Sequence, residues 1–384
     1  MDRKTGPTVF IRVLATLAAL LSLLPPFART THGRQAADLS RPIYVKWQYR
    51  TPAVTNLTPA VDLERAYLPL NNGSLLSVRL GDGGLAWKSD VGGAISAPPL
   101  VDSKSVYLAS ESLPTPNSTY PQATGVLRAL SRQSGLTSWM RTLPSPVRGL
   151  ISFNHENLFF SSSDGRFYAL SKETGEIKWI KYNASPLSPL HSQREEVLYL
   201  SDAAGDIIAL EQKSGRTAWR YRTRKTLRAP VVALENMVYT GTVDGYVIAI
   251  ERLSGRPKWR VRTGAAVQTV LAAEKYILAT SLDNFIYCLS PQNGMKLWKR
   301  QMPGRVGAPP LVLNDSVLLA PLVGDECVIL SLEDGKKTNS IYVGEDNNTG
   351  AAPLLASDTL LLTTREGLLA LSNQAAKGQT SASP

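Results

Sequence analysis

A short phrase that recurs along the chain constrains the fold more than any other feature of the sequence. Its clearest copy is Asp244–Trp259 (DGYVIAIERLSGRPKW), and close copies are Asp164–Trp179 and Ala204–Trp219. Each copy opens with a turn, passes through mostly apolar residues, turns again at a Gly and closes on a Trp. An Asp-Gly pair between alternating apolar segments indicates a β-hairpin, because a type I′ turn requires positive φ at both central residues.

The spacing of the Trp residues sets the period of this repeat. They lie at positions 47, 87, 139, 179, 219, 259 and 298, so all but one successive pair are 39 or 40 residues apart. The longer interval contains a Pro-rich stretch at 111–124, which we interpret as a loop insertion. In the best copies a Gly lies four residues before the Trp and an Ala ten residues before it. A fixed period of this length is typical of a repeat architecture.

Each unit also contains two apolar segments upstream of the hairpin, such as 197–201 (VLYLS) and 229–233 (APVVA), which gives four short strands a unit. Short β-branched and aromatic runs with regular Gly and Pro exclude helical repeats. The eighth unit (351–370) lacks a Trp strand, whereas the N-terminus has a spare one at 43–49. The sequence therefore predicts an all-β fold: an eight-bladed β-propeller of four-stranded antiparallel blades over 41–371. The N-terminal strand closes the last blade and leaves no open sheet edge.

We predict that the Trp residues are structural. A Trp on the outer strand can bury its ring between two blades, which removes on the order of 200 Å² from water. The Gly four residues earlier permits close approach of the backbone. Seven equivalent rings cannot share one planar ligand, which disfavours cofactor stacking. The predicted blade-docking residues are Trp47, Trp87, Trp139, Trp179, Trp219, Trp259 and Trp298.

The N-terminal residues 1–28 have the layout of a secretory signal, with basic residues before a short apolar run. The run Val13–Leu24 is shorter than the roughly 20 residues that cross a bilayer, although Val9–Ala28 would just span. Both a cleaved signal peptide and a retained N-terminal membrane anchor therefore stay open. No Cys follows the run, which excludes a lipoprotein anchor, so we expect an extracytoplasmic protein: secreted, periplasmic or on the outer face of the cytoplasmic membrane. Residues 29–40 are interpreted as a polar tether and 372–384 as a disordered tail.

The sequence offers no catalytic or metal-binding pattern. The three His residues have no ligand-like spacing, and no nucleophile, phosphate-binding or dinucleotide fingerprint occurs. Cys288 and Cys327 fall in inner strands of adjacent units, where they are either buried free thiols or an inter-blade disulfide. We therefore assign no catalytic, cofactor-binding or metal-binding residues.

Positive charge is concentrated in the outer strands of the fourth to sixth units, in a chain of net charge +11. Strand alternation in WRYRTR predicts that Arg220, Arg222 and Arg224 share one face. These residues form either a solvated edge that resists strand pairing or a surface for an anionic partner, such as lipid headgroups, an acidic wall polymer or an acidic protein. Nucleic acid is disfavoured as a partner, because we expect an exported protein. The candidate patch consists of Arg220, Arg222, Arg224, Lys225, Arg228, Arg260 and Arg262.

The units also support a family resemblance. Residues 129–139, 169–179, 209–219 and 249–259 follow the pattern A-L-x-x-x-[ST]-G-x-x-x-W, with a few departures, and resemble the tryptophan-docking repeats of pyrroloquinoline-quinone (PQQ) propellers. One branch comprises quinoprotein alcohol and glucose dehydrogenases, which carry an adjacent Cys pair against the quinone and a calcium site. The other is the non-catalytic group similar to BamB, an accessory subunit of outer-membrane barrel assembly. Cys288 and Cys327 are far apart in sequence, and the long insertions of the dehydrogenases are missing. The resemblance therefore implies the BamB-like branch.

The favoured hypothesis is a non-catalytic scaffold that binds a partner protein or envelope polymer through its face loops, without a cofactor and as a monomer. The irregular loops at 111–124 and 344–350 are the expected places for specificity. One alternative is a PQQ-dependent dehydrogenase that holds PQQ and calcium in a central channel. Another is an extracytoplasmic sensor module that acts through a separate partner.

Overall fold

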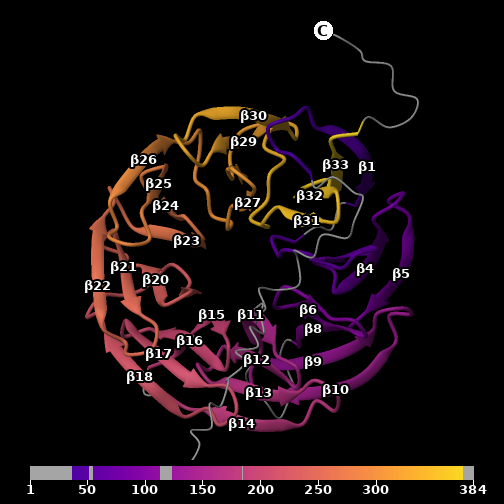
Figure 1. Ribbon diagram of the computed structural model, residues 1–384. Helices are drawn as coiled ribbons and strands as arrows, with labels where there is room; N and C mark the ends of the chain where they lie inside the picture. The colour runs from indigo at the N-terminus through magenta and orange to yellow at the C-terminus, as the bar shows by residue number, and fades with distance from the viewer. Residues whose placement is uncertain (1–36, 52–54, 113–122, 184, 375–384) are drawn as a thin grey trace, which may run out of the picture.

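The computed structural model describes residues 37–51, 55–112, 123–183 and 185–374. The predicted signal or anchor at 1–28 lies outside the described residues, as do most of the tether, most of the 111–124 insertion and most of the tail. Within the described residues, every helix or strand assigned in the structure is a strand. The strands form eight sheets, which Figure 1 shows as blades arranged in a ring.

The first four blades follow one another along the chain. Blade 1 contains β2 (Ala60–Val61), β3 (Arg65–Pro69), β4 (Ser74–Arg79) and β5 (Leu85–Asp90). Blade 2 contains β6 (Ala94–Ile95), β7 (Leu100–Val101), β8 (Ser105–Ser112), β9 (Thr124–Ser131) and β10 (Thr137–Leu143). Blade 3 contains β11 (Val147–Phe153), β12 (Asn157–Ser162), β13 (Phe167–Ser171) and β14 (Ile177–Lys181). Blade 4 contains β15 (Leu187–Arg194), β16 (Val197–Asp202), β17 (Asp206–Glu211) and β18 (Thr217–Arg222).

The remaining blades continue in the same order. Blade 5 contains β19 (Val232–Leu234), β20 (Met237–Gly241), β21 (Tyr246–Glu251) and β22 (Pro257–Arg262). Blade 6 contains β23 (Val267–Ala273), β24 (Tyr276–Ser281), β25 (Phe285–Leu289) and β26 (Lys296–Gln301). Blade 7 contains β27 (Leu311–Leu313), β28 (Ser316–Leu319), β29 (Glu326–Ser331) and β30 (Lys337–Tyr342). Blade 8 contains β31 (Leu354–Ala356), β32 (Thr359–Thr364), β33 (Gly367–Ser372) and β1 (Tyr44–Arg50).

The two ends of the described chain meet in blade 8. Strand β1 pairs antiparallel with β33, and Trp47 lies opposite Ala370. The sheet order β1-β33-β32-β31 therefore joins the first strand to the last three, and Figure 1 shows β1 beside β33. This pairing gives the last sheet its outer strand. The eight-bladed antiparallel propeller predicted from the sequence is confirmed.

The blades depart from strict regularity at one inner strand. In blade 2 the inner strand is broken into β6 and β7, and both pieces pair with β8. Pro98 and Pro99 lie in the break. Because Pro has no N–H to donate to the ladder, a sheet strand is interrupted there. The sheet therefore contains five strands rather than the predicted four.

The boundaries of the propeller differ from those predicted. The tether was expected to extend to residue 40, but Leu39 is only 2% exposed and packs in the core between blades 7 and 8. At the other end β33 includes Ser372, and the Asn373 side chain donates to the Asp38 and Pro42 carbonyls. The apolar side chain of Leu39 explains the difference, since it is buried rather than left in a polar linker.

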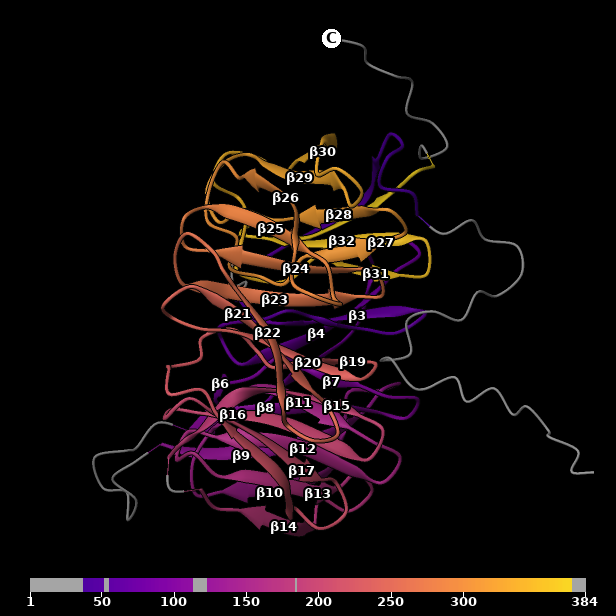
Figure 2. The same cartoon turned by 60° about the vertical axis from the view of Figure 1, so that its left-hand side comes forward.

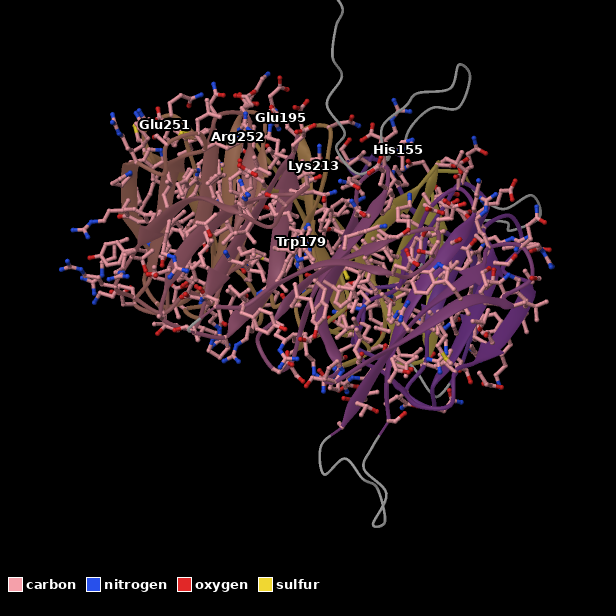
Figure 3. All side chains as sticks on the ribbon, turned by 90° about the horizontal axis from the view of Figure 1, so that it is seen from below. His155, Trp179, Glu195, Lys213, Glu251 and Arg252 are labelled. Atoms are coloured by element: carbon pink, nitrogen blue, oxygen red, sulfur yellow. The ribbon has the colours of Figure 1, made fainter. Side chains whose placement is uncertain are left out.

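The meander within each blade divides the turns between two faces of the ring. The turns from first to second strand and from third to fourth strand lie on one face, which we call the clamp face. The turns from second to third strand and the connections between blades lie on the other, the connection face. Figure 2 shows the stacked strands from the side, and Figure 3 shows Glu195 and Arg252 along one face with Trp179 farther down the ring wall.

Candidate functional site

Each Trp docks on the blade that follows it. A Cβ added to Gly215 would lie 2.7 Å from Cε3 of Trp179, and one added to Gly255 would lie 2.8 Å from Cε3 of Trp219. The same contact occurs for every Trp, and these turn glycines also have positive φ. The Gly of each repeat therefore serves two purposes: it permits the turn, and it leaves room for the indole of the preceding blade. The stacked pairs are Trp47–Gly83, Trp87–Gly135, Trp139–Gly175, Trp179–Gly215, Trp219–Gly255, Trp259–Gly294 and Trp298–Gly335.

The indole N–H groups are also used between blades. Each Nε1 donates to a backbone carbonyl at the third-to-fourth-strand turn of the next blade, as Trp47 does to Leu80 at 2.8 Å. A buried indole therefore keeps a hydrogen-bond partner. The structure thus places all seven predicted docking residues between blades. The remaining acceptors, in chain order, are Arg132, Lys172, Gln212, Arg252, Pro291 and Leu332.

The interface between blades 7 and 8 has Asn339 in the position of the Trp. Its Nδ2 donates to the carbonyls of Leu39 (3.1 Å) and Arg41 (2.8 Å). Leu39 packs against the core there, together with Cys327 and Ile341. The N-terminal segment thus covers the interface that has no indole.

Four interfaces carry an additional polar contact on the clamp face. The residue whose carbonyl accepts the indole N–H extends its own side chain back to the preceding blade. Arg132 pairs with Asp62 at 3.2 Å, and Lys172 pairs with Asp102 at 2.9 Å. Gln212 accepts a hydrogen bond from Asn154 at 2.8 Å. In the other three Trp interfaces the corresponding residues are Leu80, Pro291 and Leu332, which have no polar side chain to offer.

The contact with the most hydrogen bonds joins blades 4 and 5. The Arg252 guanidinium binds both oxygens of Glu195, at 3.0 and 3.1 Å, and its Nε donates to the Glu235 carbonyl at 2.7 Å. Arg252 is 6% exposed, whereas Glu195 is 53% exposed. A two-pronged guanidinium–carboxylate pair is geometrically specific. The charges of Arg132, Lys172 and Arg252 are therefore used within the protein.

The polar contacts of the clamp face shift the pKa values of the side chains that form them. Burial alone would raise the pKa of Asp102, but the Lys172 ammonium and two backbone N–H donors outweigh it and lower the pKa. Burial and the neighbouring Asp102 carboxylate raise the pKa of Tyr107 well above its ordinary value. Asp102 is thus held as a carboxylate and Tyr107 as a neutral donor, which is the pairing that a structural contact requires.

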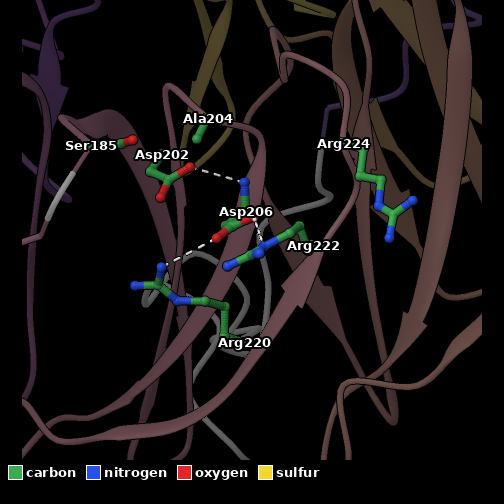
Figure 4. A pocket seen from close by; sticks show the side chains of 7 residues that line it. All are labelled: Ser185, Asp202, Ala204, Asp206, Arg220, Arg222 and Arg224. Carbon is green, nitrogen blue, oxygen red and sulfur yellow. Dashed lines mark hydrogen bonds and ion pairs between the residues drawn. The ribbon is translucent and has the colours of Figure 1, made fainter.

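The connection face of blade 4 contains a cavity of about 350 Å³. Three of the predicted basic residues line it, and Figure 4 shows Asp206 between Arg220 and Arg222. Asp206 Oδ2 lies 3.2 Å from Arg220 Nη1, and its Oδ1 lies 3.5 Å from Arg222 Nε. The cavity lining is Ser185, Asp202, Ala204, Asp206, Arg220, Arg222 and Arg224.

The Arg220–Arg224 prediction is corrected in part. Arg220 and Arg222 are on β18, as alternation predicted, but that strand ends at Arg222. Arg224 lies beyond the end with φ of 59°. A positive φ breaks the alternation, so Arg224 reaches the cavity from the connection to blade 5 rather than from a shared strand face.

The other predicted basic residues do not join this cavity. Lys225 pairs with Asp244 on blade 5 at 3.1 Å, and Arg228 donates to Gln268 on blade 6 at 2.5 Å. Arg260 and Arg262 are exposed on β22, where the Arg260 guanidinium lies 5.3 Å from the Tyr246 ring. The predicted patch is thus distributed over blade 4, blade 5 and the connection between them, and only Arg220, Arg222 and Arg224 come together at the cavity.

The 344–350 loop is less available than the sequence suggested. Asn348 and Thr349 are buried, and Gly350 N donates to Asn56 Oδ1 at 3.3 Å. Only Glu345 and Asp346 are exposed in this loop. Residues 113–122 of the other irregular loop lie outside the described residues.

One buried titratable pair lies between the inner strands of blades 3 and 4. His191 Nε2 lies 2.6 Å from Ser152 Oγ, and the imidazole packs edge-to-face on Phe167. His191 Nδ1 is buried without a hydrogen-bond partner among the described residues. Burial lowers the pKa of His191 to about 4, so the imidazole is neutral at pH 7. Without a group to orient Nδ1, this pair lacks the third member of a catalytic triad.

The two cysteines are free and buried. Cys288 lies opposite Trp298 in the slot that Ala fills elsewhere, and burial raises its pKa to about 12. The disulfide left open by the sequence does not form in this structure. A thiol at this pKa is protonated and unreactive at pH 7.

The described residues contain no group of three or more His, Cys, Asp or Glu side chains arranged to hold a metal ion. In the same part of the chain, no helix has the length and apolar character needed to traverse a membrane.

Sequence reasoning missed the clamp residues and both cavity aspartates. The clamp partners Asp62 and Arg132 are 70 residues apart, so no local pattern connects them. The cavity, however, corresponds to a departure from the repeat that is visible in the sequence. Where blades 3 and 5 have Asp164 and Asp244 in the turn, blade 4 has Ala204.

The fold and these repeated contacts define a PQQ-like β-propeller. A family profile described as outer membrane protein assembly factor BamB matches residues 35–181, 183–274 and 264–382, so the chain belongs to this family. Among solved structures it is similar to BamB from Moraxella catarrhalis, with 13% identity, TM-score 0.69, and coverage of 86% of this chain and 97% of that one. A search of curated proteins gave no match.

Two further solved structures show how widely the fold is shared. The computationally designed Ika8 protein has 10% identity and TM-score 0.71, covering 85% of this chain and 98% of its own. Quinohemoprotein alcohol dehydrogenase from Comamonas testosteroni has 11% identity and TM-score 0.68, covering 89% of this chain and 78% of its own. At these identities the likeness concerns the fold alone.

Proposed function

We propose that this protein is a non-catalytic, extracytoplasmic scaffold that binds a partner protein through the connection face at blades 4 and 5. The family description, an outer membrane protein assembly factor, supports a role in assembling other proteins. The observation that carries the proposal is the contrast in how charge is used. On the clamp face Arg252 is almost fully buried in a pair, whereas on the connection face Arg222 is 70% exposed beside its carboxylate.

This contrast favours the connection face for a physical reason. An exposed guanidinium keeps free N–H donors for a partner's carboxylates or carbonyls, and Arg is enriched at protein interfaces. A buried, paired guanidinium has no such capacity. We expect an acidic partner surface, because rim charges of opposite sign steer association.

The test compares two double variants of matched charge on opposite faces of blade 4. Arg222→Ser/Arg224→Ser removes two exposed charges from the connection face, and Lys213→Ser/Arg216→Ser removes two exposed charges from the clamp face. Partners are captured by cross-linking in the native host and quantified by mass spectrometry. We expect the first variant to lose a specific partner at least tenfold and the second to retain it. Equal retention or equal loss would contradict the assigned face.

The dehydrogenase alternative has a separate test. PQQ and Ca²⁺ are added to the purified protein, and quinone absorbance and dye reduction with alcohols and sugars are followed. The scaffold proposal predicts neither signal. A bound quinone with turnover would overturn it.

A further inference from the structure

The outer strands of blades 5 and 6 are strongly basic. Strand β22 reads PKWRVR and β26 reads KLWKRQ, so together they carry six cations and no Asp or Glu. Figure 1 shows the two strands as neighbours on the outer circumference of the ring. Positive charge therefore collects on the side wall of the ring. The exposed cations of the two strands, which we call the rim patch, are Lys258, Arg260, Arg262, Lys296 and Lys299.

One position on the third strand of these blades decides whether the cations are neutralised. It lies three residues before the small residue that faces the Trp across the hairpin. In blade 4 this position holds Asp206, which pairs with Arg220 of the outer strand at 3.2 Å. It holds Tyr246 in blade 5 and Phe285 in blade 6. An aromatic ring thus replaces the carboxylate in two adjacent blades.

The cations of blades 5 and 6 lie over these rings. The Arg260 guanidinium is 5.3 Å from the centroid of the Tyr246 ring, and the Lys299 ammonium is 4.9 Å from that of Phe285. A ring attracts a cation through its quadrupole but has no net negative charge. The positive charge of both side chains therefore remains uncompensated and faces solvent.

The outer strands of blades 1 and 3 treat their cations differently. Lys88 on β5 pairs with Asp90 at 3.3 Å, and Lys178 on β14 pairs with Glu176 at 3.8 Å. In the rim patch, only Lys258 forms an ion pair among the residues that the structure describes. The rim patch is thus a local excess of unpaired charge, which favours an anionic partner.

The composition of the rim patch favours an anionic bilayer over other anionic partners. Three of its five cations are Lys, a residue that is depleted at protein interfaces. The Tyr246 and Phe285 rings lie under cations, so they offer no free platform for a nucleobase or a sugar. Leu253 (74% exposed) precedes β22, and Met295 (59% exposed) precedes β26. Basic side chains beside exposed apolar ones suit the headgroup region of an anionic membrane.

From these observations we propose that the rim patch binds the surface of a membrane that contains anionic phospholipids. Each Lys or Arg held near such a surface adds to the attraction, which salt screens. The ring then stands on its side wall, with the clamp face and the connection face both open to the aqueous phase. The membrane contact does not depend on the protein partner proposed above, because that partner binds at the connection face.

The experiment measures co-sedimentation of the purified full chain with phosphatidylcholine vesicles that contain or lack phosphatidylglycerol. Arg260→Ser/Lys299→Ser removes two unpaired cations from the rim patch. Lys88→Ser/Lys178→Ser removes two paired cations from blades 1 and 3 and is the control of equal charge. Residues 1–36 are common to all variants, so their contribution to vesicle binding cancels in the comparison. The thermal midpoint of each variant checks folding.

A second pair of variants leaves every cation in place. Tyr246→Asp/Phe285→Asp introduces the carboxylate that blade 4 has at this position, where Asp206 pairs with Arg220. Tyr246→Ser/Phe285→Ser removes the same two rings without adding charge. The first variant should neutralise the cations within the protein, and the second should leave them available to lipid.

We expect the wild type, the Lys88→Ser/Lys178→Ser control and the Ser ring variant to bind phosphatidylglycerol vesicles. The rim variant and the Asp ring variant should bind them at least tenfold more weakly, with thermal midpoints close to those of their controls. High salt should weaken the binding of the wild type.

Four results would overturn the proposal. The first is equal vesicle binding by the rim variant and its control of equal charge, and the second is equal loss in the Ser and Asp ring variants. The third is binding of the wild type to poly-glutamate without binding to anionic vesicles, which would indicate an acidic protein partner. The fourth is release from vesicles by inorganic phosphate but not by chloride at the same ionic strength, which would indicate a site for free phosphate.

Discussion

The two faces of the ring are built from the same meander yet use their polar residues differently. On the clamp face, turn glycines receive the indoles of the preceding blade, and Arg132, Lys172 and Arg252 pair across interfaces. On the connection face of blade 4, Arg222 and Arg224 border a cavity whose buried carboxylate is incompletely paired. The comparison indicates that the docked indoles and their polar contacts hold the blades together on the clamp face, whereas blade 4 leaves exposed guanidinium groups on the connection face.

We expect the largest loss of unfolding free energy when an indole is removed from an interface between two blades. Trp179→Ala deletes a ring that stacks on Gly215 and donates to the Gln212 carbonyl at 2.9 Å. Truncation of a largely buried Trp costs about 3–5 kcal/mol, through lost burial and the cavity left behind. Equilibrium denaturant unfolding measures the loss. Asn339→Ala, at the interface without an indole, is the comparison and should cost less. Equal losses of unfolding free energy in the two variants would contradict the structural role of the Trp.

The next largest effect on stability is expected for His191, which lies on the inner strand β15. His191 has a pKa of about 4 in the folded protein, against 6.5 ordinarily. The unfolded chain therefore takes up a proton at a higher pH than the folded one, and stability falls as pH drops from about 7 to 4. With about 1.4 kcal/mol for each pKa unit, the loss attributable to this residue is about 3 kcal/mol.

The measurement is the unfolding free energy at pH 7, 5.5 and 4 for wild type and His191→Gln. Carboxylates titrate in both proteins, so the difference between the two curves isolates the imidazole. We expect wild type to lose more stability than the variant over this window. Parallel curves would show that the imidazole is not buried in the neutral form.

A smaller effect is expected for the most complete clamp. Arg252→Ala removes the pair with Glu195 and the hydrogen bond to the Glu235 carbonyl. Glu195 is about half exposed and is resolvated readily, so we expect a loss of about 1–2 kcal/mol, below that of a fully buried pair. Lys213→Ala, exposed on the same face, serves as the control and should stay within about 0.5 kcal/mol of wild type. Partner capture should be unchanged in both, and loss of capture in Arg252→Ala at intact folding would assign binding to the clamp face.

The sequence predicted the fold because its signals are local and repeated. Each Trp and Gly has a fixed spacing, and the spare N-terminal strand matches the strand missing from the last unit. The burial of Leu39 was missed because it follows a basic, polar stretch that resembles a tether. Its actual environment depends on Asn339, about 300 residues away, which replaces a Trp and binds the N-terminal backbone.

The site was predicted less completely because its determinants are not periodic. Alternation placed Arg220 and Arg222 correctly, but the positive φ of Arg224 is not encoded in a strand pattern. In the sequence Asp206 looks like an ordinary polar residue at the end of a strand, and only the structure shows that Arg220 pairs with it. The substitution of Ala204 for a turn Asp is visible in the sequence, but its consequence, a cavity, requires the neighbouring side chains to be placed.

The most direct test of the division between faces is hydrogen–deuterium exchange of the full chain, alone and with its captured partner. We expect partner-dependent protection in the connection-face segments of blades 4 and 5, at 203–206 and 223–228. We expect no change in the clamp-face turns at 212–216 and 252–256. Protection of the clamp-face turns without protection of the connection-face segments would contradict binding through the connection face.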